Sequence, residues 1–247
     1  MNTKLQDLKF QKNLFENHLS FNSYHRGKVI RKNGAIYIES SHPAFQVAIP
    51  ENATNLTEIL ENYNQVRLVP WSTLQEQELN SMNLKPSYTL AYMILDTDFI
   101  SGKAMEDLEI QTVSDEKGMD IFTEIQTRGF LKDDESYEDW YTWLRKYNHK
   151  NLGNPNQIFY IGFIQGKPAG ITLLLITEKI GGIYAVATLP EYRKRGISTA
   201  ILKHATSFAL AKGCDIIALQ ALHGTYAESL YTKLGFRTSF ISPAFSK

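Results

Sequence analysis

The sequence predicts an α/β protein in which short apolar strands alternate with amphipathic helices. Strand-like apolar runs, such as YTLAYMILD at 88–96 and KPAGITLLLITEK at 167–179, are separated by segments with helical periodicity. Turn residues such as QGKP at 165–168 stand between successive strands. Hydrophobic residues make up 43% of the 247 residues, which is enough for a sizeable buried core.

The first third of the chain predicts a mixture of helices and strands. Asn55 and Ser72 are helix N-cap residues by type, and Pro70 ends a strand. A polar stretch at 97–108 follows, and we place a domain boundary there, which gives domains of residues 1–105 and 106–247. The predicted helices are residues 13–21, 56–63 and 72–82, and the predicted strands are residues 35–40, 45–50, 65–70 and 88–96.

The second part of the chain predicts the element order β-α-α-β-β-β-α-β-α-β. The helix at 197–213 keeps one face apolar, and Gly213 ends it as a C-cap. The predicted strands are residues 108–113, 158–166, 167–179, 181–190, 214–221 and 237–242, and the other predicted helices are residues 114–130, 133–150 and 225–236.

Composition restricts the functional class. Lys plus Arg equals Asp plus Glu at 26 each, and this zero net charge argues against a nucleic-acid binder. The single cysteine, Cys214, excludes an internal disulfide and fits a reducing compartment. The N-terminus has no apolar signal region, and the longest aliphatic run, ITLLLI at 171–176, is too short to span a bilayer. We therefore expect a cytoplasmic protein with neither a nucleic-acid nor a membrane partner.

A basic, glycine-containing loop lies between a strand ended by Pro190 and the helix that begins at Ile197. A helix start has free N–H groups and partial positive charge, and Gly196 lets an anion approach the backbone closely. Arg193 to Arg195 add three positive charges. The loop is therefore either a phosphate cradle or a solvated basic turn, and its composition alone does not decide between them. The common nucleotide-binding motifs GxxxxGK[ST] and GxGxxG do not occur in the sequence.

Tyr231, on the last predicted helix, is a candidate general acid. A phenol with a pKa near about 10 stays protonated at neutral pH and can give its proton to a thiolate whose free pKa is about 8.5. Leu230 and Leu234 flank the tyrosine, so the same residue also fits a packing role in the core.

Together the two segments resemble the GCN5-related N-acetyltransferase (GNAT) superfamily. Its pyrophosphate motif is Arg or Gln, two residues, Gly, one residue, then Gly or Ala; RKRGIS at 193–198 matches, with Ser198 in the last place. The later LYTKLGF at 230–236 is similar to the superfamily element LYxKxGF, which carries a thiolate-protonating tyrosine. The resemblance covers most of residues 106–247 and implies a mixed, mostly antiparallel sheet with splayed central strands, flanked by helices.

The resemblance also implies acetyl-CoA as co-substrate, with no metal. Main-chain groups of the strand would contact the pantetheine arm, loop amides would hold the pyrophosphate, and Tyr231 would be the general acid. In many relatives an asparagine stands where this chain has Gly224, and Ser229 is a possible substitute. The implied cofactor contacts are Val186, Ala187, Thr188, Arg193, Lys194, Arg195, Gly196, Ile197, Ser198, Thr199 and Ser229.

The implied activity is acetyl transfer by direct attack of a primary amine on acetyl-CoA. The amine would belong to a small molecule, an amino acid or a peptide, and the protein would be a monomer or a homodimer. A second hypothesis is an acyl-CoA-binding regulatory protein without turnover, because Gly224 replaces the asparagine and no general base is evident. His223 and Glu228 are more typical of a loop residue and a solvated helix residue.

Two further features concern the acceptor and metals. The acidic run DDESYED at 133–139 and the aromatic residues Trp140, Tyr141 and Trp143 either line an acceptor site or form an ordinary packed helix. The six histidines show no metal-ligand spacing, so we predict no metal site.

The first third resembles a degenerate acetyltransferase-like domain that precedes the catalytic one in a tandem subgroup. SHPAFQVAIP at 41–50 and LNSMNLKPSYTLAYMILD at 79–96 carry this resemblance. This region has no basic glycine loop, so we do not expect acetyl-CoA to bind there.

Overall fold

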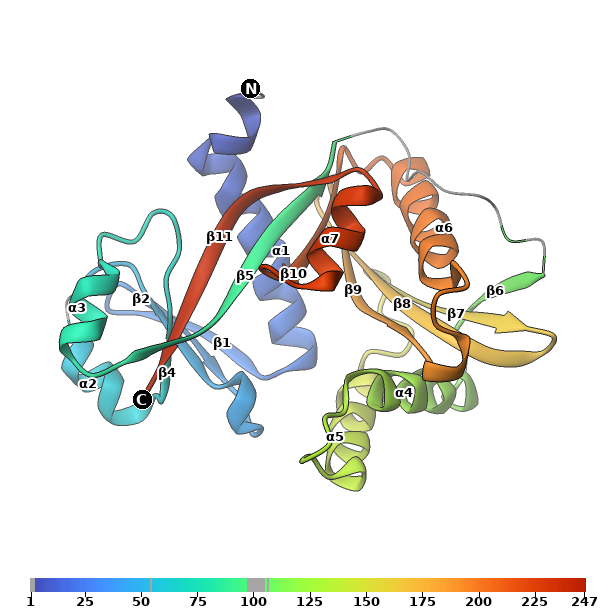
Figure 1. Cartoon of the computed structure of the whole chain (residues 1–247), viewed down its shortest axis with the longest axis horizontal. Coiled ribbons are helices and arrows are strands. Elements are labelled where there is room, and N and C mark those ends of the chain that lie inside the picture. Colours follow the sequence, from blue (N-terminus) through green and yellow to red (C-terminus); the bar gives the residue numbers. More distant parts are fainter. Residues whose placement is uncertain (1–2, 54, 97–104, 106) are drawn as a thin grey trace. The chain divides into compact units, whose positions relative to one another are not determined.

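A computed structural model describes residues 3–53, 55–96, 105 and 107–247 (Figure 1). By internal contacts the chain divides into two compact units. The first comprises Met1–Met93, Gln220–Leu230 and Arg237–Lys247, and the second comprises Ile94–Leu219 and Tyr231–Phe236. The predicted boundary at 105/106 falls in a stretch of which 97–104 and 106 lie outside the described residues.

The first unit has a sheet with the strand order β1-β2-β3-β4-β11-β5. The hairpin β1–β2, the pair β2–β3 and the pair β4–β11 are antiparallel, whereas β3 and β4 are parallel. Its strands are β1 (Lys28–Lys32), β2 (Ala35–Glu39), β3 (Val47–Pro50), β4 (Gln65–Arg67), residues 85–93 of β5 (Lys85–Leu95) and residues 237–246 of β11 (Phe236–Ser246). Its helices are α1 (Leu8–His25), α2 (Leu56–Asn62) and α3 (Glu76–Ser81), with short 3₁₀ turns at Thr3–Gln6 and Pro43–Phe45.

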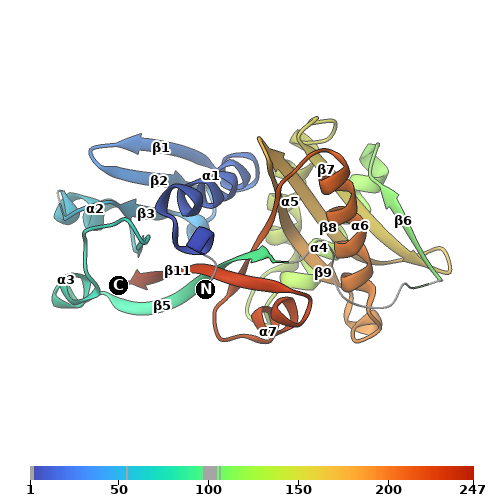
Figure 2. The ribbon, with the colours of Figure 1, turned by 90° about the horizontal axis from the view of Figure 1, so that it is seen from above.

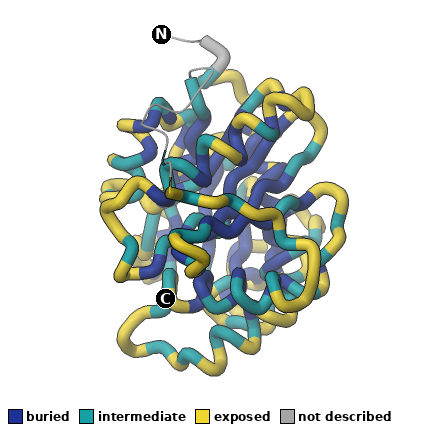
Figure 3. The backbone as a smooth tube through the Cα atoms, turned by 90° about the vertical axis from the view of Figure 1, so that its right-hand side faces the viewer, coloured by how far each residue is buried: buried dark blue, intermediate teal, exposed yellow. Residues whose placement is uncertain are grey.

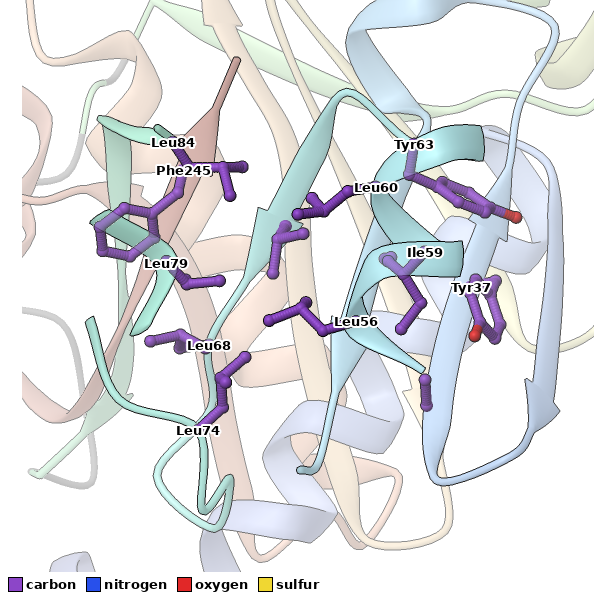
Figure 4. Close-up of a cluster of buried hydrophobic side chains, with 13 residues drawn as sticks. Tyr37, Leu56, Ile59, Leu60, Tyr63, Leu68, Leu74, Leu79, Leu84 and Phe245 are labelled. Carbon is purple, nitrogen blue, oxygen red and sulfur yellow. The ribbon is translucent and has the colours of Figure 1, made fainter. Parts of the chain in front are cut away.

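Helices cover both faces of this sheet because side chains alternate along each strand. One face packs with α2 and α3 into an apolar cluster that includes Tyr37, Val66 and Phe245 (Figure 4). The opposite face meets α1, where Phe15 is buried and contacts the ring of Tyr92 on β5. Arg67 follows Val66 on β4 and therefore lies on the α1 face.

The second unit has a sheet with the strand order β10-β9-β8-β7-β6. The strands β6 to β9 are successively antiparallel, and β10 is parallel to β9. The strands are β6 (Leu108–Thr112), β7 (Gln157–Ile164), β8 (Lys167–Thr177), β9 (Ile180–Thr188) and residues 216–219 of β10 (Ile216–Leu222). The helices are α4 (Glu116–Phe130), α5 (Tyr137–Lys150), α6 (Ile197–Ala211) and residues 231–233 of α7 (Tyr226–Lys233), with a 3₁₀ turn η3 (Pro190–Tyr192).

The element order from β6 to β11 confirms the predicted β-α-α-β-β-β-α-β-α-β arrangement. Helix α6 covers one side of β7–β9 and α4 the other, and from above α6 overlies these strands (Figures 1 and 2). Burial follows the strands, while the turns are exposed (Figure 3). This mixed, mostly antiparallel sheet between helices is the predicted fold class.

Several element limits differ from prediction for local reasons. Asp7 caps α1 by accepting from the N–H of Phe10 at 2.7 Å, so this helix begins earlier than expected. Ser72 caps no helix, because its hydroxyl donates to the Pro50 carbonyl at 2.9 Å and α3 begins only after Gln75. Strand β1 was not predicted at all, although the turn after it, Asn33-Gly34, is a typical hairpin signal.

Among the helices of the described residues, none combines the length and the apolar composition that crossing a bilayer requires.

Candidate functional site

The candidate site begins with an irregularity in β9. The register between β8 and β9 shifts between Ile171 and Leu173, so that β9 contains one extra residue. Ala185 adopts a left-handed conformation with φ 49° at this point. The bulge lies directly before Val186, Ala187 and Thr188, the residues predicted to contact the pantetheine arm.

The parallel pairing with β10 covers only the first part of β9. It runs from Ile216 opposite Ile180 to Leu219 opposite Ile183, which is just before the bulge. In the described part of the chain, no paired residue joins β10 to positions 184–188. The main-chain groups on this side of β9 are therefore not used by a neighbouring strand, as expected for splayed central strands.

A sharply turning loop connects β9 to α6. After η3, the Nε of Arg193 donates to the main-chain carbonyl of Thr188 at 3.2 Å, which ties the loop to the strand end. Lys194 and Gly196 both have positive φ, of 62° and 84°. Left-handed residues that recur in this way are typical of main-chain turns whose N–H groups bind anions.

The amides of this loop are unused. No acceptor among the described residues receives the main-chain N–H groups of Lys194 to Thr199; the first helical bond runs from the Ala200 N–H to the Gly196 carbonyl at 3.0 Å. Gly196 provides no capping side chain, and the first turn of α6 has no acidic residue. Because the side chains of Arg193 to Arg195 are exposed, the helix start is open to an anion from solvent.

Neighbouring contacts hold this loop in place and leave it positively charged. The one acidic side chain in η3, Glu191, pairs with Arg128 of α4 at 3.2 Å. Its own main-chain N–H and then Arg128 lower the pKa of Glu191. The guanidinium of Arg195 lies 5.5 Å from the ring centre of Tyr192. Ile197, at the start of α6, is fully buried and anchors the helix against the sheet.

Tyr231 belongs to the same unit as the loop. It lies in the second turn of α7, is 9% exposed and packs edge-on against Phe236, with 6.0 Å between ring centres. Its hydroxyl has no hydrogen-bond partner among the described residues. Burial raises the pKa of Tyr231 to about 12, so the phenol is protonated at neutral pH.

A bulged strand, an open basic helix start and a protonated tyrosine now stand in one unit. Residues 119–236, which contain all three, match the model of the Acetyltransferase (GNAT) family. By this match, residues 119–236 belong to the GNAT superfamily. An uncharacterized N-acetyltransferase of Methanocaldococcus jannaschii is 25% identical over 126 residues, which are 48% of this chain and 56% of that protein. The match therefore spans little more than half the length of this relative.

Solved structures share the fold of this protein over nearly the whole chain. A GCN5-related N-acetyltransferase from Kribbella flavida has a TM-score of 0.69 and 11% identity, covering 96% of this chain and 95% of its own. A functionally unknown conserved protein from Staphylococcus epidermidis has a TM-score of 0.68 and 14% identity, covering 91% and 95%. At such low identity these likenesses show the fold alone.

Residues 220–230, which precede Tyr231 in sequence, belong to the first unit. Glu228 is not the solvated residue that the sequence favours: its side chain is 15% exposed and accepts from the Gly224 N–H at 2.7 Å and from Thr238 at 3.2 Å. It also contacts His223 Nδ1 at 3.0 Å. Ser229, the predicted substitute cofactor contact, is exposed on α7 and stays a prediction.

The pKa of the Glu228 carboxyl lies below the ordinary value for a glutamate. Burial acts to raise it, but the Gly224 N–H and His223 outweigh that effect. The link from Glu228 back to Gly224 resembles the glutamate half of a helix capping box, and this signal could have placed the carboxylate from sequence.

The aromatic residues of α5 pack mainly on one another. Trp140 and Trp143 meet edge-on at 5.9 Å between ring centres, and Trp143 lies 5.0 Å from Tyr147. Tyr141, like these three, is half-buried. The acidic residues 133–135 precede α5, which begins after Ser136. These contacts favour the packing interpretation of the helix and leave its acceptor role untested.

No three His, Cys, Asp or Glu side chains within the described part of the chain gather closely enough to hold a metal ion.

Proposed function

We propose that this GNAT protein transfers an acetyl group from acetyl-CoA to a primary amine of a small molecule, an amino acid or a peptide. The observation that carries the proposal is the open start of α6, where consecutive main-chain N–H groups are unused and three exposed basic side chains stand beside them. A diphosphate fits this chemistry because it offers several charged acceptor oxygens to the same amides.

The cofactor would extend from the loop along the unpaired side of β9. The amides of Lys194 to Thr199 would hold the diphosphate, with Arg193 at the first motif position. The main-chain groups of Val186, Ala187 and Thr188 would bind the pantetheine arm and orient the acetyl carbonyl. The bulge supports this role, because it leaves these groups without a neighbouring strand.

In the reaction, the neutral amine attacks the thioester carbonyl and forms the C–N bond. A strand amide near Thr188 would stabilise the oxyanion. The C–S bond then breaks, and the sulfur leaves as a thiolate. Tyr231 would donate its O–H to this sulfur, and the proton that the amine loses restores the phenol through solvent. Because its pKa of about 12 makes Tyr231 a weak acid, it contributes most as a hydrogen-bond donor during C–S cleavage.

We also propose that the chain is a tandem GNAT protein, in which the region 1–105 is a degenerate, non-catalytic copy in front of a catalytic region 106–247. The fold likeness to the Kribbella flavida structure extends over 96% of the chain, which supports this view. The residues that carry the proposed chemistry all lie after position 185.

Calorimetric titration with acetyl-CoA and a thiol-release assay on the full chain test this function. The amine panel should contain a simple alkylamine, a polyamine, free amino acids and peptides with free N-termini. We expect saturable binding and thiol release with at least one amine class. Binding without release from any amine would favour the regulatory alternative, and absence of binding would overturn both hypotheses.

A further inference from the structure

The first unit buries a positive charge without a counter-ion. Arg67 of β4 is only 2% exposed, and its Nε and Nη2 have no hydrogen-bond partner. A guanidinium does not lose its proton in a protein, so the charge stays in place. Because an unpaired buried charge is among the most costly features that a core can contain, Arg67 needs an explanation.

The groups around Arg67 do not neutralise it. No carboxylate of the described residues forms an ion pair with its side chain. His18 lies 2.7 Å from the Tyr92 hydroxyl, and burial, followed by the charges of Arg67 and Arg26, holds its pKa well below 6.5. Burial raises the pKa of Tyr92 to about 12. Both neighbours are therefore uncharged at neutral pH.

The ring of Phe15 lies beside Arg67 and also lines a cavity. The guanidinium carbon of Arg67 lies 5.8 Å from the centre of this ring, and Phe15 itself lines a cavity of about 420 Å³ within the first unit. Trp71 forms another part of the wall and meets Phe15 edge-on at 5.3 Å. The ammonium of Lys12 lies 5.6 Å from the Trp71 ring centre. The volume falls in the range of small-molecule sites.

The charged side chains at the cavity wall nearly balance one another. Lys12 and Arg31 stand against Glu16 and Glu51, whereas the ammonium of Lys32, which also borders the cavity, lies 5.4 Å from the ring centre of Tyr37 on the other face of the sheet. Glu16 is already paired with Arg31 at 2.5 Å, which leaves Lys12 against Glu51. The buried charge of Arg67 adds to this balance, because an apolar wall screens a charge far less than water does.

We propose that this cavity binds a small carboxylate with an aromatic or apolar body. The carboxylate is attracted by Lys12 and by the field of Arg67, and the apolar body lies on Phe15 and Trp71. A carboxylate suits the site better than a phosphate because much of the wall is apolar and the excess positive charge is small. The site lies wholly in the first unit and is independent of the proposed acetyl transfer.

Calorimetric titration of the full chain tests the site with acetate, benzoate and phenylacetate, and with phenylacetamide as the uncharged match of phenylacetate. We expect saturable binding of an aromatic carboxylate that is at least tenfold tighter than binding of the amide. Equal binding of phenylacetate and phenylacetamide, or no saturation by any carboxylate up to about 10 mM, would overturn the proposal.

Two variants then locate the charge. Arg67→Met should weaken aromatic carboxylate binding roughly 10- to 100-fold, while the empty protein melts about 2–4 °C higher because the unpaired charge is gone. Lys12→Met should also weaken binding, which keeps the test decisive if Arg67→Met does not fold. Lys9→Met is the matched control, because Lys9 is exposed on the same helix and does not line the cavity. Unchanged binding in the Lys12 variant, or in a folded Arg67 variant, would contradict the proposal.

Discussion

The two units place positive charge in opposite ways. The second unit exposes Arg193, Lys194 and Arg195 beside unused amides, where water solvates them at little cost until an anion arrives. The first unit buries Arg67 beside Phe15, where the charge costs stability for as long as it is unpaired. Exposed basic side chains therefore change the free energy of folding little. A buried, unpaired basic side chain lowers the stability of the fold, but it attracts an anionic ligand more strongly because water does not screen it.

Tyr231→Phe should have the largest effect and should act only on the second unit's chemistry. Removal of the proton donor should lower kcat in the thiol-release assay roughly 10²- to 10⁴-fold. Acetyl-CoA affinity and carboxylate binding should stay near wild type. Tyr226→Phe is the matched control on the same helix, because Tyr226 is 75% exposed. An unchanged kcat for Tyr231→Phe would mean that another group or water serves the thiolate.

Gly129→Ala should destabilise the protein by about 1–3 kcal/mol. A Cβ at Gly129 of α4 would lie 2.6 Å from the Cβ of Ala187 on β9, and neither atom can move without its backbone. Chemical denaturation measures the loss. Gly118→Ala on the same helix is the control, since its nearest contacts are side-chain atoms from 3.2 Å. If both variants were equally stable, α4 would not pack against the bulged strand as described.

Acid should weaken the first unit through His18. The pKa of His18 in the folded protein lies below its ordinary value of 6.5, so the unfolded chain binds more protons at acidic pH. The stabilisation is complete above pH 6.5 and is lost as the pH falls, on the order of 1–2 kcal/mol by pH 5. Denaturant titrations at pH 7 and pH 5 should show this loss in wild type and a smaller loss in His18→Asn. Equal losses would show that His18 titrates normally.

Glu191→Gln should have the smallest effect. Removal of this carboxylate frees Arg128 and makes the exposed loop more positive, so acetyl-CoA should bind a few-fold tighter at low salt, with a change in folding stability below about 1 kcal/mol. Glu178→Gln, in the turn at the other end of β9, is the control. A gain that persisted in 1 M salt would contradict a charge effect.

Much of the second unit could be predicted because its signals are local. The strand before Pro190, the loop with Gly196 and the helix from Ile197 are consecutive in sequence, and each residue type matches its place. The bulge at Ala185 was not predicted, because it depends on the register with β8 and not on the residues of β9 alone.

The first unit shows the opposite limit. Arg67 occurs in the ordinary strand pattern QVRLVP, which gives no sign that the residue is buried. Its burial results from the packing of α1 on this face of the sheet, which only the structure shows. The division into units was also hidden, since residues 220–230 and 237–247 group with a unit formed mainly by the first 93 residues. The pairing of strands that are distant in sequence does not change the residue type expected at any one position. These features could therefore be found only from the structure.

The most direct test of the central claim, that the loop amides hold a diphosphate, compares coenzyme A with pantetheine, which lacks it. Calorimetry on wild type and Gly196→Glu gives the four affinities. Among the described residues, a Cβ at Gly196 would meet Met105 Sδ at 3.6 Å, but the φ of 84° strains any side chain there, so the melting temperature of the variant is measured beside its affinities to show that it is folded. We predict that wild type prefers coenzyme A by at least about 100-fold and that Gly196→Glu loses this preference. A variant that kept the full preference would contradict the account.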